Sequence, residues 1–454
     1  MTEPEMTEEE LLNKAQEPAR KASLYHPFYE GKIQTNPKCA IRGMEDFGFW
    51  YTPGVARPCE EIAEDPAQVY RHTSKGNMVA VVSDGSRVLG LGDIGPQASL
   101  PVMEGKAILF KYLGGVDAFP LPLEVETPDE MVATVKALQP AFGGINLEDI
   151  STPKCFRILR QLREELEIPV WHDDQQGTAA IELAGVINAL KVVDKRLTEA
   201  RYCIFGAGAA NIALTRIMFA TGVPPERVVV CDSKGILHEG RADLKENKED
   251  NPYKWKLARK TNGLEKRGGP KEGIAGTDVL VAASTPGPNV IEKAWIGGMN
   301  EDSVVFAVAN PVPEIWPWEA KEAGALVVGT GRSDFPNQIN NSLGFPGIFR
   351  GALDVGAKTI TDQMTIAAAH AIAATAEEKG LSEEYIVPQM DEPQVFINEA
   401  VAVGEKAIEQ GLARKELSPQ ELRNRAEKKV TGGRKWTEKM MEAGLIKDPP
   451  EETA

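Results

Sequence analysis

The chain has 454 residues, of which 42% are hydrophobic and 26% are charged, and its formal net charge at pH 7 is −16. This length predicts two large domains or about three ordinary ones. A chain this acidic repels phosphate backbones, which argues against a nucleic-acid partner. No apolar run approaches the ~18 residues that a membrane helix needs, so we expect no membrane partner either. The N-terminus shows no secretory signal and the five cysteines are scattered, which favours a cytoplasmic location.

Polar residues dominate the start of the chain, and 1–22 form a leader of helical composition. From residue 78 onward, short apolar runs alternate with glycine turns and helical patterns, which is typical of α/β units. We expect a helix that begins near Glu104 and carries Lys106. A strand-like run follows at 115–124, and helices are expected near 128–139 and 153–167.

A second α/β block begins after the segment WHDDQQGT. Its helical and strand-like runs alternate in the rhythm of a mononucleotide-binding fold. The runs are a helix at 179–193, a strand at 201–205, a helix ending near Ala220, and strands at 227–231, 278–283, 303–309 and 325–329. The polar segment 245–272 is expected to be a surface insertion, and a solvated loop without a role is the more common explanation for such a segment. Long amphipathic patterns predict helices over most of the remaining chain.

A glycine turn follows the strand predicted at 201–205 and opens a helix. Gly206 permits the tight turn, and Gly208 lets the backbone approach a pyrophosphate at the helix N-terminus. Asn211 stands near the third glycine position, so the fingerprint is imperfect. Asp232 ends the next strand, about 20 residues further on, where a carboxylate meets the adenosine ribose of a dinucleotide. Together, these features predict a nicotinamide dinucleotide site and hydride transfer.

The choice between NAD and NADP stays open. Asp232 favours NAD because its charge would repel a 2′-phosphate. Lys234 and Arg241 lie close by in the sequence, however, and a cation there could accept the phosphate of NADP. NAD is slightly favoured, and use of NADP or of both remains compatible with these residues.

Two acidic pairs lie where strands are expected to end. Glu148 and Asp149 follow a glycine-rich run, and Asp173 and Asp174 follow the probable strand IPVWH. Open α/β sheets bind ligands at the carboxyl ends of their strands, and carboxylate oxygens suit Mg²⁺ or Mn²⁺. Acids in loops also serve commonly as solvated groups or helix caps, so the pairs alone leave both interpretations open.

Proton transfer points to Lys106 and Tyr51, because none of the five histidines lies in an acid/base motif. A lysine at the start of a helix has its pKa lowered by the helix dipole and can act as a general base. The alternative for Lys106 alone is an ordinary surface lysine.

These separate signals meet in one family, because the sequence resembles malic enzymes of the short prokaryotic kind. The resemblance covers most of residues 25–378. Its motifs are YTPGVARPC (51–59), KGNMVAVVSDGSRVLGLGDIG (75–95), PVMEGKAILFK (101–111), FGGINLEDI (142–150), HDDQQGTA (172–179), FGAGAAN (205–211), ANPVPEI (309–315) and GTGRSDFPNQINNSLGFPGIFRGALDV (329–355).

The resemblance implies a role for individual residues. Glu148, Asp149 and Asp174 match the ligands of Mg²⁺ or Mn²⁺. Tyr51 matches the general acid, Lys106 the general base or the partner that tunes the tyrosine, and Asp173 a residue that lies beside the metal and assists proton transfer. Malate would be held by Arg87, which many short members lack, and by Asn310 and Asn341. The dinucleotide would contact Gly206, Gly208, Ala209, Asn211, Asp232, Ser284 and Asn310.

The resemblance also implies an architecture. We expect an α/β protein with an N-terminal α/β substrate and dimerisation domain (1–177), a Rossmann-like NAD(P)-binding domain (178–380) and a helical C-terminal extension (381–454). Malic enzymes are dimers or tetramers, which implies a homodimer or homotetramer with the N-terminal region at the dimer contact.

The implied reaction is the metal-dependent oxidative decarboxylation of malate to pyruvate and CO₂, with reduction of NAD or NADP. A malolactic enzyme shares these motifs but returns the hydride and releases lactate. An amino-acid dehydrogenase has a similar two-domain layout without a carboxylate metal site. A non-catalytic protein that senses dinucleotides is the remaining alternative, and the retention of Tyr51, Lys106 and the acid set argues against it.

Overall fold

The first of two parallel sheets lies in the N-terminal half of the chain, for which a computed structural model describes residues 8–451. Its four strands run in the order β2-β1-β3-β4. They comprise β1 (Met78–Ser83), β2 (Asp117–Pro122), β3 (Gly144–Leu147) and β4 (Val170–His172). Helices α5 (Gly95–Gly114), α6 (Pro128–Leu138) and α7 (Lys154–Glu165) connect them, which confirms the predicted α/β units.

The second sheet has the order β10-β9-β8-β5-β6-β7. Five strands are parallel and the short β7 pairs with β6 in antiparallel fashion. The strands are β5 (Tyr202–Phe205), β6 (Val228–Asp232), β7 (Gly235–Ile236), β8 (Val279–Ala282), β9 (Ser303–Ala307) and β10 (Ala325–Thr330). This arrangement confirms the predicted Rossmann-like domain.

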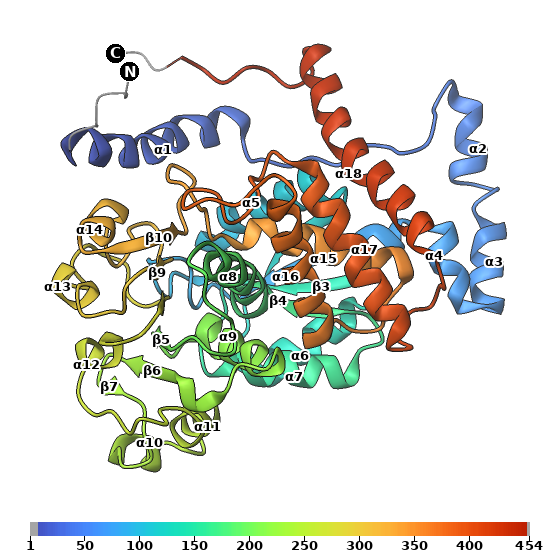
Figure 1. Cartoon of the computed structure of the whole chain (residues 1–454). Coiled ribbons are helices and arrows are strands. Elements are labelled where there is room, and N and C mark those ends of the chain that lie inside the picture. Colours follow the sequence, from blue (N-terminus) through green and yellow to red (C-terminus); the bar gives the residue numbers. More distant parts are fainter. Residues whose placement is uncertain (1–7, 452–454) are drawn as a thin grey trace.

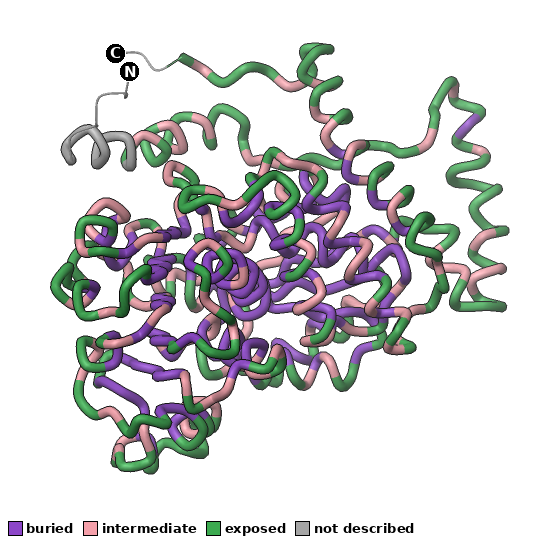
Figure 2. The backbone as a smooth tube through the Cα atoms, in the orientation of Figure 1, coloured by how far each residue is buried: buried purple, intermediate pink, exposed green. Residues whose placement is uncertain are grey.

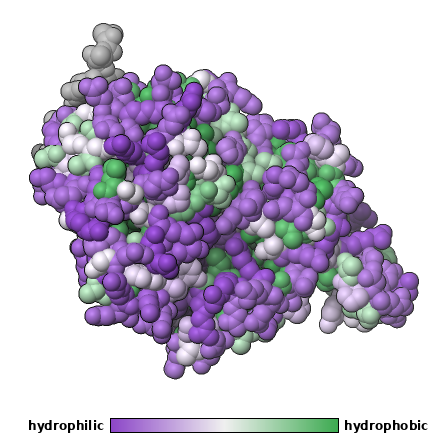
Figure 3. Space-filling model, turned by 60° about the horizontal axis from the view of Figure 1, so that its bottom comes forward, coloured by the Kyte–Doolittle hydropathy of each residue, from purple (hydrophilic) through white to green (hydrophobic). Residues whose placement is uncertain are grey.

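Buried strands form the centre of the molecule, as Figure 2 shows. All of β3 and β5 is buried, and the strands are rich in valine, isoleucine and other apolar residues. Parallel strands covered by helices on both faces need such continuous apolar runs. On the surface, hydrophilic side chains predominate in the view of Figure 3.

One helix joins the two sheets. α8 (Asp173–Val192) begins where β4 ends and packs against α9 (Ala209–Ala220) and α16 (Asp362–Glu377) of the second half. Most of the helix is buried, and its buried positions are mainly small or aliphatic, although Gln175, Gln176, Glu182 and Asn188 are buried as well. The end of the first sheet and the core of the second half are therefore connected by continuous helix.

The C-terminal part of the chain is helical, as predicted. α15 (Phe345–Val355), α17 (Pro393–Glu409) and α18 (Pro419–Glu442) pack on one another and against α5. Ser418 and Glu421 form the expected capping box at the start of α18. These helices therefore return to the first sheet and cover it.

The N-terminal residues form an extended arm. Its helices are α1 (Glu8–Tyr29), α2 (Phe47–Trp50), α3 (Ala56–Glu64) and α4 (Val69–His72). Figure 1 shows α2 and α3 standing away from the body of the molecule. The first seven residues of the predicted leader lie outside the described residues.

Two expectations about local structure need correction. α5 begins at Gly95, not near Glu104, so Lys106 lies in the middle of the helix. The segment 245–272 is partly helical, with α11 (Pro252–Lys260) and α12 (Pro270–Ile274) preceded by α10 (Ala242–Glu246). The remaining short helices are α13 (Lys293–Ile296) and α14 (Pro317–Glu322). Within residues 8–451, no helix is long and apolar enough to cross a membrane.

Candidate active site

Three carboxylates meet at the carboxyl edge of the first sheet. Glu148 and Asp149 follow β3, and Asp174 lies in the first turn of α8 directly after β4. Because β3 and β4 are parallel neighbours, their ends lie side by side. One oxygen from each of the three side chains lies within 4.8 Å of the others. The backbone N–H of Asp149 also donates to Oδ2 of Asp174 at 2.8 Å.

The electrostatics of this cluster suit a divalent cation. Burial raises the pKa of Asp149 to about 8, and the neighbouring charge of Asp174 adds to the effect. Burial also raises the pKa of Glu148 well above its ordinary value. Oδ2 of Asp149 is buried without a hydrogen-bond partner, and such an atom is costly unless a ligand compensates it. Hard oxygen donors of this kind fit Mg²⁺ or Mn²⁺.

Lys106 projects from α5 into the same edge. Its Nζ lies 2.7 Å from Oδ2 of Asp173, 3.0 Å from Oε1 of Glu148 and 4.4 Å from the ring centroid of Phe345. Burial alone would lower the pKa of Lys106, but the carboxylates of Asp173 and Glu148 outweigh it and raise the pKa above its ordinary value. The expected lowering by the helix dipole is therefore wrong, because Lys106 lies more than two turns from the helix start and faces acids.

Two residues that sequence reasoning missed hold these carboxylates in place. Nε1 of Trp171 donates to Oδ1 of Asp173 at 2.9 Å, and Nδ2 of Asn146 donates to Oε2 of Glu148 at 2.9 Å. Each donor stands two positions before the acid that it binds. The sequence carried no separate signal for either donor, because each stands inside a buried strand.

Arg87 and Tyr51 lie differently from the buried residues. The backbone N–H of Arg87 donates to the carbonyl oxygen of Asp149 at 3.0 Å, so Arg87 borders the acid cluster while its side chain is exposed. Tyr51 directly follows α2 in the arm, and 71% of its surface is exposed. The single chain thus gathers Lys106, Asp173 and the three acids but leaves Tyr51 on the outlying arm.

The glycine turn has the shape that a dinucleotide site requires. Gly206 has φ +101°, and a Cβ there would lie 2.2 Å from the carbonyl oxygen of Ala283. Gly208 precedes Ala209, the first residue of α9, and a Cβ on Gly208 would meet no atom within 4 Å. Asn211 is buried and its Nδ2 donates to the carbonyls of Phe205 and Gly206, so it holds the turn in shape.

The remaining predicted contacts with the dinucleotide lie in the loops that follow β8 and β9. The N–H and Oγ of Ser284 donate to Oε1 of Glu314 at 2.7 and 3.0 Å, and the N–H of Ala309 donates to Oε2 at 3.1 Å. Glu314, which sequence reasoning missed, therefore ties the loop after β8 to the loop after β9, next to Asn310.

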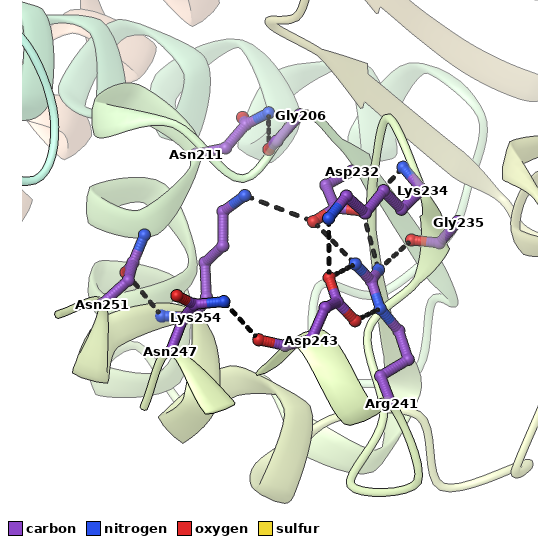
Figure 4. A network of polar contacts seen from close by, with 10 residues as sticks. All are labelled: Gly206, Asn211, Asp232, Lys234, Gly235, Arg241, Asp243, Asn247, Asn251 and Lys254. Carbon is purple, nitrogen blue, oxygen red and sulfur yellow. Dashed lines mark hydrogen bonds and ion pairs between the residues drawn. The ribbon is translucent and has the colours of Figure 1, made fainter. Parts of the chain in front are cut away.

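Asn341 approaches the acids through a glycine. A Cβ placed on Gly177 would lie 1.9 Å from Oδ1 of Asp173 and 3.2 Å from Cβ of Asn341. The absence of a side chain at Gly177 therefore lets the two residues come together. In the second sheet, Asp232 terminates β6 and receives side-chain hydrogen bonds from Arg241 and Lys254 (Figure 4).

Comparisons with known proteins agree with this geometry. Residues 30–163 match the family model "Malic enzyme, N-terminal domain", and residues 175–408 match "Malic enzyme, NAD binding domain". The chain belongs to the malic enzyme family. Its members catalyse the oxidative decarboxylation of malate with NAD(P), and the chain is accordingly an NAD(P)-dependent oxidoreductase.

Individual relatives cover most of the chain. The bifunctional malic/malolactic enzyme of Bacillus subtilis is 48% identical over 89% of this chain and 96% of its own length. The NAD-dependent malic enzyme of Geobacillus stearothermophilus is 50% identical over 86% of this chain and 79% of its own. The crystal structure of the Entamoeba histolytica malic enzyme superposes with a TM-score of 0.96 at 45% identity, covering 99% of this chain and 93% of that one.

Proposed function

We propose that the chain binds malate against the Glu148, Asp149 and Asp174 cluster at the edge of the first sheet and the dinucleotide against the Gly206 turn of the second. The observation that carries this proposal is the position of Lys106, whose Nζ bonds to Asp173 and Glu148 directly beside the candidate metal ligands. When bound, a divalent cation supplies Lewis-acid polarisation of the substrate oxygens and the nicotinamide supplies the hydride acceptor.

The protein's own residues then position the substrate and move protons. The backbone of Arg87 bonds to Asp149, and the charge of its exposed guanidinium acts to lower the pKa of that acid, so Arg87 is close enough to pair with a carboxylate of malate. Nζ of Lys106 donates to Oδ2 of Asp173 at 2.7 Å. We infer that this pair acts as one base in which the carboxylate of Asp173 accepts the proton of the C2 hydroxyl, because the raised pKa of Lys106 keeps it an ammonium that holds the carboxylate but cannot take the proton itself.

The test measures malate-dependent reduction of NAD and NADP with and without Mg²⁺ or Mn²⁺. We expect a chelator to abolish turnover, and Lys106→Met to lose about a thousandfold or more in kcat while it keeps dinucleotide binding. Full activity without a divalent metal would refute the metal role, and normal turnover of Lys106→Met would refute the assigned base.

After CO₂ is lost, C3 of the product must receive a proton, and the residue that donates it does not lie among the buried residues beside Lys106. Tyr51 fits this role by resemblance, yet it lies on the arm, which stands away from the body of its own chain. Phe47, Phe49 and Trp50 beside it are also exposed, and clustered exposed aromatics are typical of an interface. We therefore propose that a second copy of the chain inserts Tyr51 beside Lys106, which makes the working enzyme at least a homodimer.

A mixing experiment separates this arrangement from a tyrosine supplied within one chain. Tyr51→Phe and Lys106→Met chains are each expected to be inactive. After unfolding and refolding together, a mixed dimer regains one intact site, so the mixture recovers roughly a quarter of wild-type activity. If both residues act within one chain, every site in the mixture carries a defect, and no recovery occurs.

A malolactic reaction is the second candidate, because the Bacillus subtilis relative is named a bifunctional malic/malolactic enzyme. Product analysis distinguishes the two reactions. Pyruvate with stoichiometric reduced dinucleotide supports the malic reaction, whereas lactate without net reduction supports the malolactic one.

A further inference from the structure

A cavity of about 310 Å³ lies where the two halves of the chain meet. Its lining residues come from α7 of the first half, from α8, and from α9 and α11 of the second half. Figure 1 shows α7, α9 and α11 near one another below α8. The described lining residues include none that we assign to malate, to the metal or to the dinucleotide. A molecule in this cavity would therefore touch both halves without entering either of those sites.

Arg163 of α7 lines the cavity as a partly buried cation. Its Nε and Nη2 donate to the carbonyl oxygens of Val170 and Ile360 at 3.0 and 2.6 Å, and no carboxylate within residues 8–451 forms an ion pair with it. Burial lowers the pKa of Arg163 to about 10, although the charge of Asp362 acts against this effect, and the charge of Arg216 adds to it. A cation that loses hydration without gaining a counter-ion favours a bound anion.

Two further arginines of the lining keep donors available. Nε and Nη2 of Arg216 bond to the two oxygens of Asp362 at 2.7 and 3.0 Å, which leaves Nη1 for another acceptor. Arg160, three residues before Arg163 on α7, forms no hydrogen bond or ion pair with the described residues. The one acid among the described lining residues is Glu164, which is exposed. In a chain of formal net charge −16, three guanidinium groups thus gather around one space.

Uncharged side chains complete the lining. Gln175 of α8 is 1% exposed, and its Nε2 is buried without a hydrogen-bond partner. Such a donor is costly unless a ligand accepts its hydrogen bond. The rings of Phe156 and Tyr253, whose centroids lie 4.3 Å apart, add an apolar side. Tyr253 belongs to the segment 245–272, so this insertion supplies part of the cavity wall.

We propose that the cavity binds a small polyanion with carboxylate or phosphate groups, held by Arg160, Arg163 and Arg216 and by the amide of Gln175. Planar guanidinium groups pair with the oxygens of both classes of anion. An anion with two or more charged groups can engage α7 and α9 together. Because these helices belong to different halves, the bound anion would hold the halves at one angle. The inference goes beyond the proposed function, since it uses neither the malate site nor the dinucleotide site.

Isothermal titration of the metal-free protein in a phosphate-free buffer tests this site. The probes are tricarballylate, which carries only carboxylates, and pyrophosphate, which carries only phosphate groups. At least one probe is expected to bind with a dissociation constant below about 1 mM and to bind equally well in saturating NADH. Binding of a single probe assigns the anion to that class. Arg160→Gln removes a guanidinium without described partners and is expected to weaken binding by about tenfold or more.

Arg157→Gln is the matched control for the change of charge. Arg157 lies on the same helix and is exposed, but it pairs with Asp129 and is not among the lining residues. Its replacement should leave the affinity unchanged. Equal weakening in the two variants, undiminished binding in Arg160→Gln, or no binding of either probe would overturn the proposal. Displacement of the probe by NADH would overturn it too, because the anion would then occupy the dinucleotide site. Failure of NADH itself to bind would instead contradict the proposed function.

Discussion

Asp173 has both oxygens fixed by buried donors, Lys106 on one side and Trp171 on the other. Burial raises the pKa of Asp173, and the ammonium of Lys106 and the indole N–H of Trp171 act against this effect. Trp171 itself is fully buried. Its hydrogen bond therefore sets both where the carboxylate points and how readily it holds a proton.

Trp171→Phe is expected to slow turnover by removing this bond. Loss of one hydrogen bond to a buried charge costs about 1.5–3 kcal/mol, which corresponds to about tenfold to a hundredfold in kcat if it is felt in the reaction. The pH profile of kcat should shift to higher pH, because Asp173 loses a donor that favours its charged form. Trp295→Phe, a partly buried tryptophan on α13 in the second half, serves as control and should leave the profile unchanged. An unshifted profile in Trp171→Phe would show that the indole only fills space.

The pKa of about 8 at Asp149 predicts how metal binding depends on pH. Below pH 8 a cation must displace the proton, so affinity for Mn²⁺ should rise about tenfold per pH unit and level off above pH 8. Titration calorimetry in buffers of different ionisation enthalpy should detect release of close to one proton near pH 7. Affinity that stays constant between pH 6 and 8 would contradict this prediction.

The same shift predicts the stability of the metal-free protein. The folded-state pKa of Asp149 lies above the value of about 3.9 in an unfolded chain, so the folded state binds more protons in between. The stabilisation of the folded state by this proton is fully present below pH 4 and is lost as the pH rises through 8. Raising the pH from 6 to 8 should therefore lower the melting temperature of the metal-free protein, and adding Mg²⁺ should restore it. Asp149→Asn should weaken both effects when the variant is compared with the wild-type protein over the same pH range.

At the level of single residues, the sequence predicted the acids well and their supports poorly. Glu148 and Asp173 were found because the first follows a glycine-rich run and the second a probable strand, both expected to end at the sheet edge. Asn146 and Trp171 stand inside those runs, where a polar or aromatic residue is not distinguishable from ordinary core. The pKa of Lys106 was predicted in the wrong direction, since its acidic neighbours come from distant parts of the chain.

Among the elements, strands were predicted more closely than helix starts. The ends of β5 and β6 lie within one residue of the runs that predicted them. The start of α5 was misplaced because Pro101 interrupts the helical pattern. Pro96, which lies in the first turn of the helix, is a favourable residue at that position. Proline inside a helix removes one hydrogen bond, and tertiary packing of α5 against α15 and α18 compensates for it.

The glycine turn gives a matched pair of variants. Gly206→Ala places a Cβ at φ +101° and 2.2 Å from the carbonyl oxygen of Ala283, which should cost about 1–3 kcal/mol of stability and weaken dinucleotide binding. Gly208→Ala meets no protein atom. It should therefore melt like the wild-type protein yet bind NADH less tightly, because its methyl group would face the pyrophosphate. Equal melting losses in both variants would contradict the assignment of separate roles.

For the whole molecule, the proposed role of the arm would link assembly to activity. Replacing Phe49 and Trp50 together by serine should weaken self-association by about tenfold or more. Sedimentation velocity should then show smaller species at low concentration, with specific activity falling in parallel. Dinucleotide binding should persist, because α9 and β6 lie in the second half. Trp436→Ser, an equally exposed tryptophan on α18, is the control. A dissociated variant that keeps full specific activity would refute the role of a second copy.

The position of Tyr51 was beyond sequence reasoning for a physical reason. A motif specifies which residue does the chemistry, but the arm carries few contacts that fix its place relative to α5. The family resemblance brought Tyr51 and Lys106 into one mechanism, while the fold of one chain leaves them on separate parts.

Helix α8 has a mechanical consequence. Its first turn contributes Asp174 to the acid cluster, and its remaining turns are embedded in the second half against α9 and α16. Rotation of one half against the other would therefore move Asp174 relative to Glu148 and Asp149, which stay with the first sheet. A cation held by all three acids would resist this movement. Occupancy of the metal site and the angle between the two halves would therefore depend on each other.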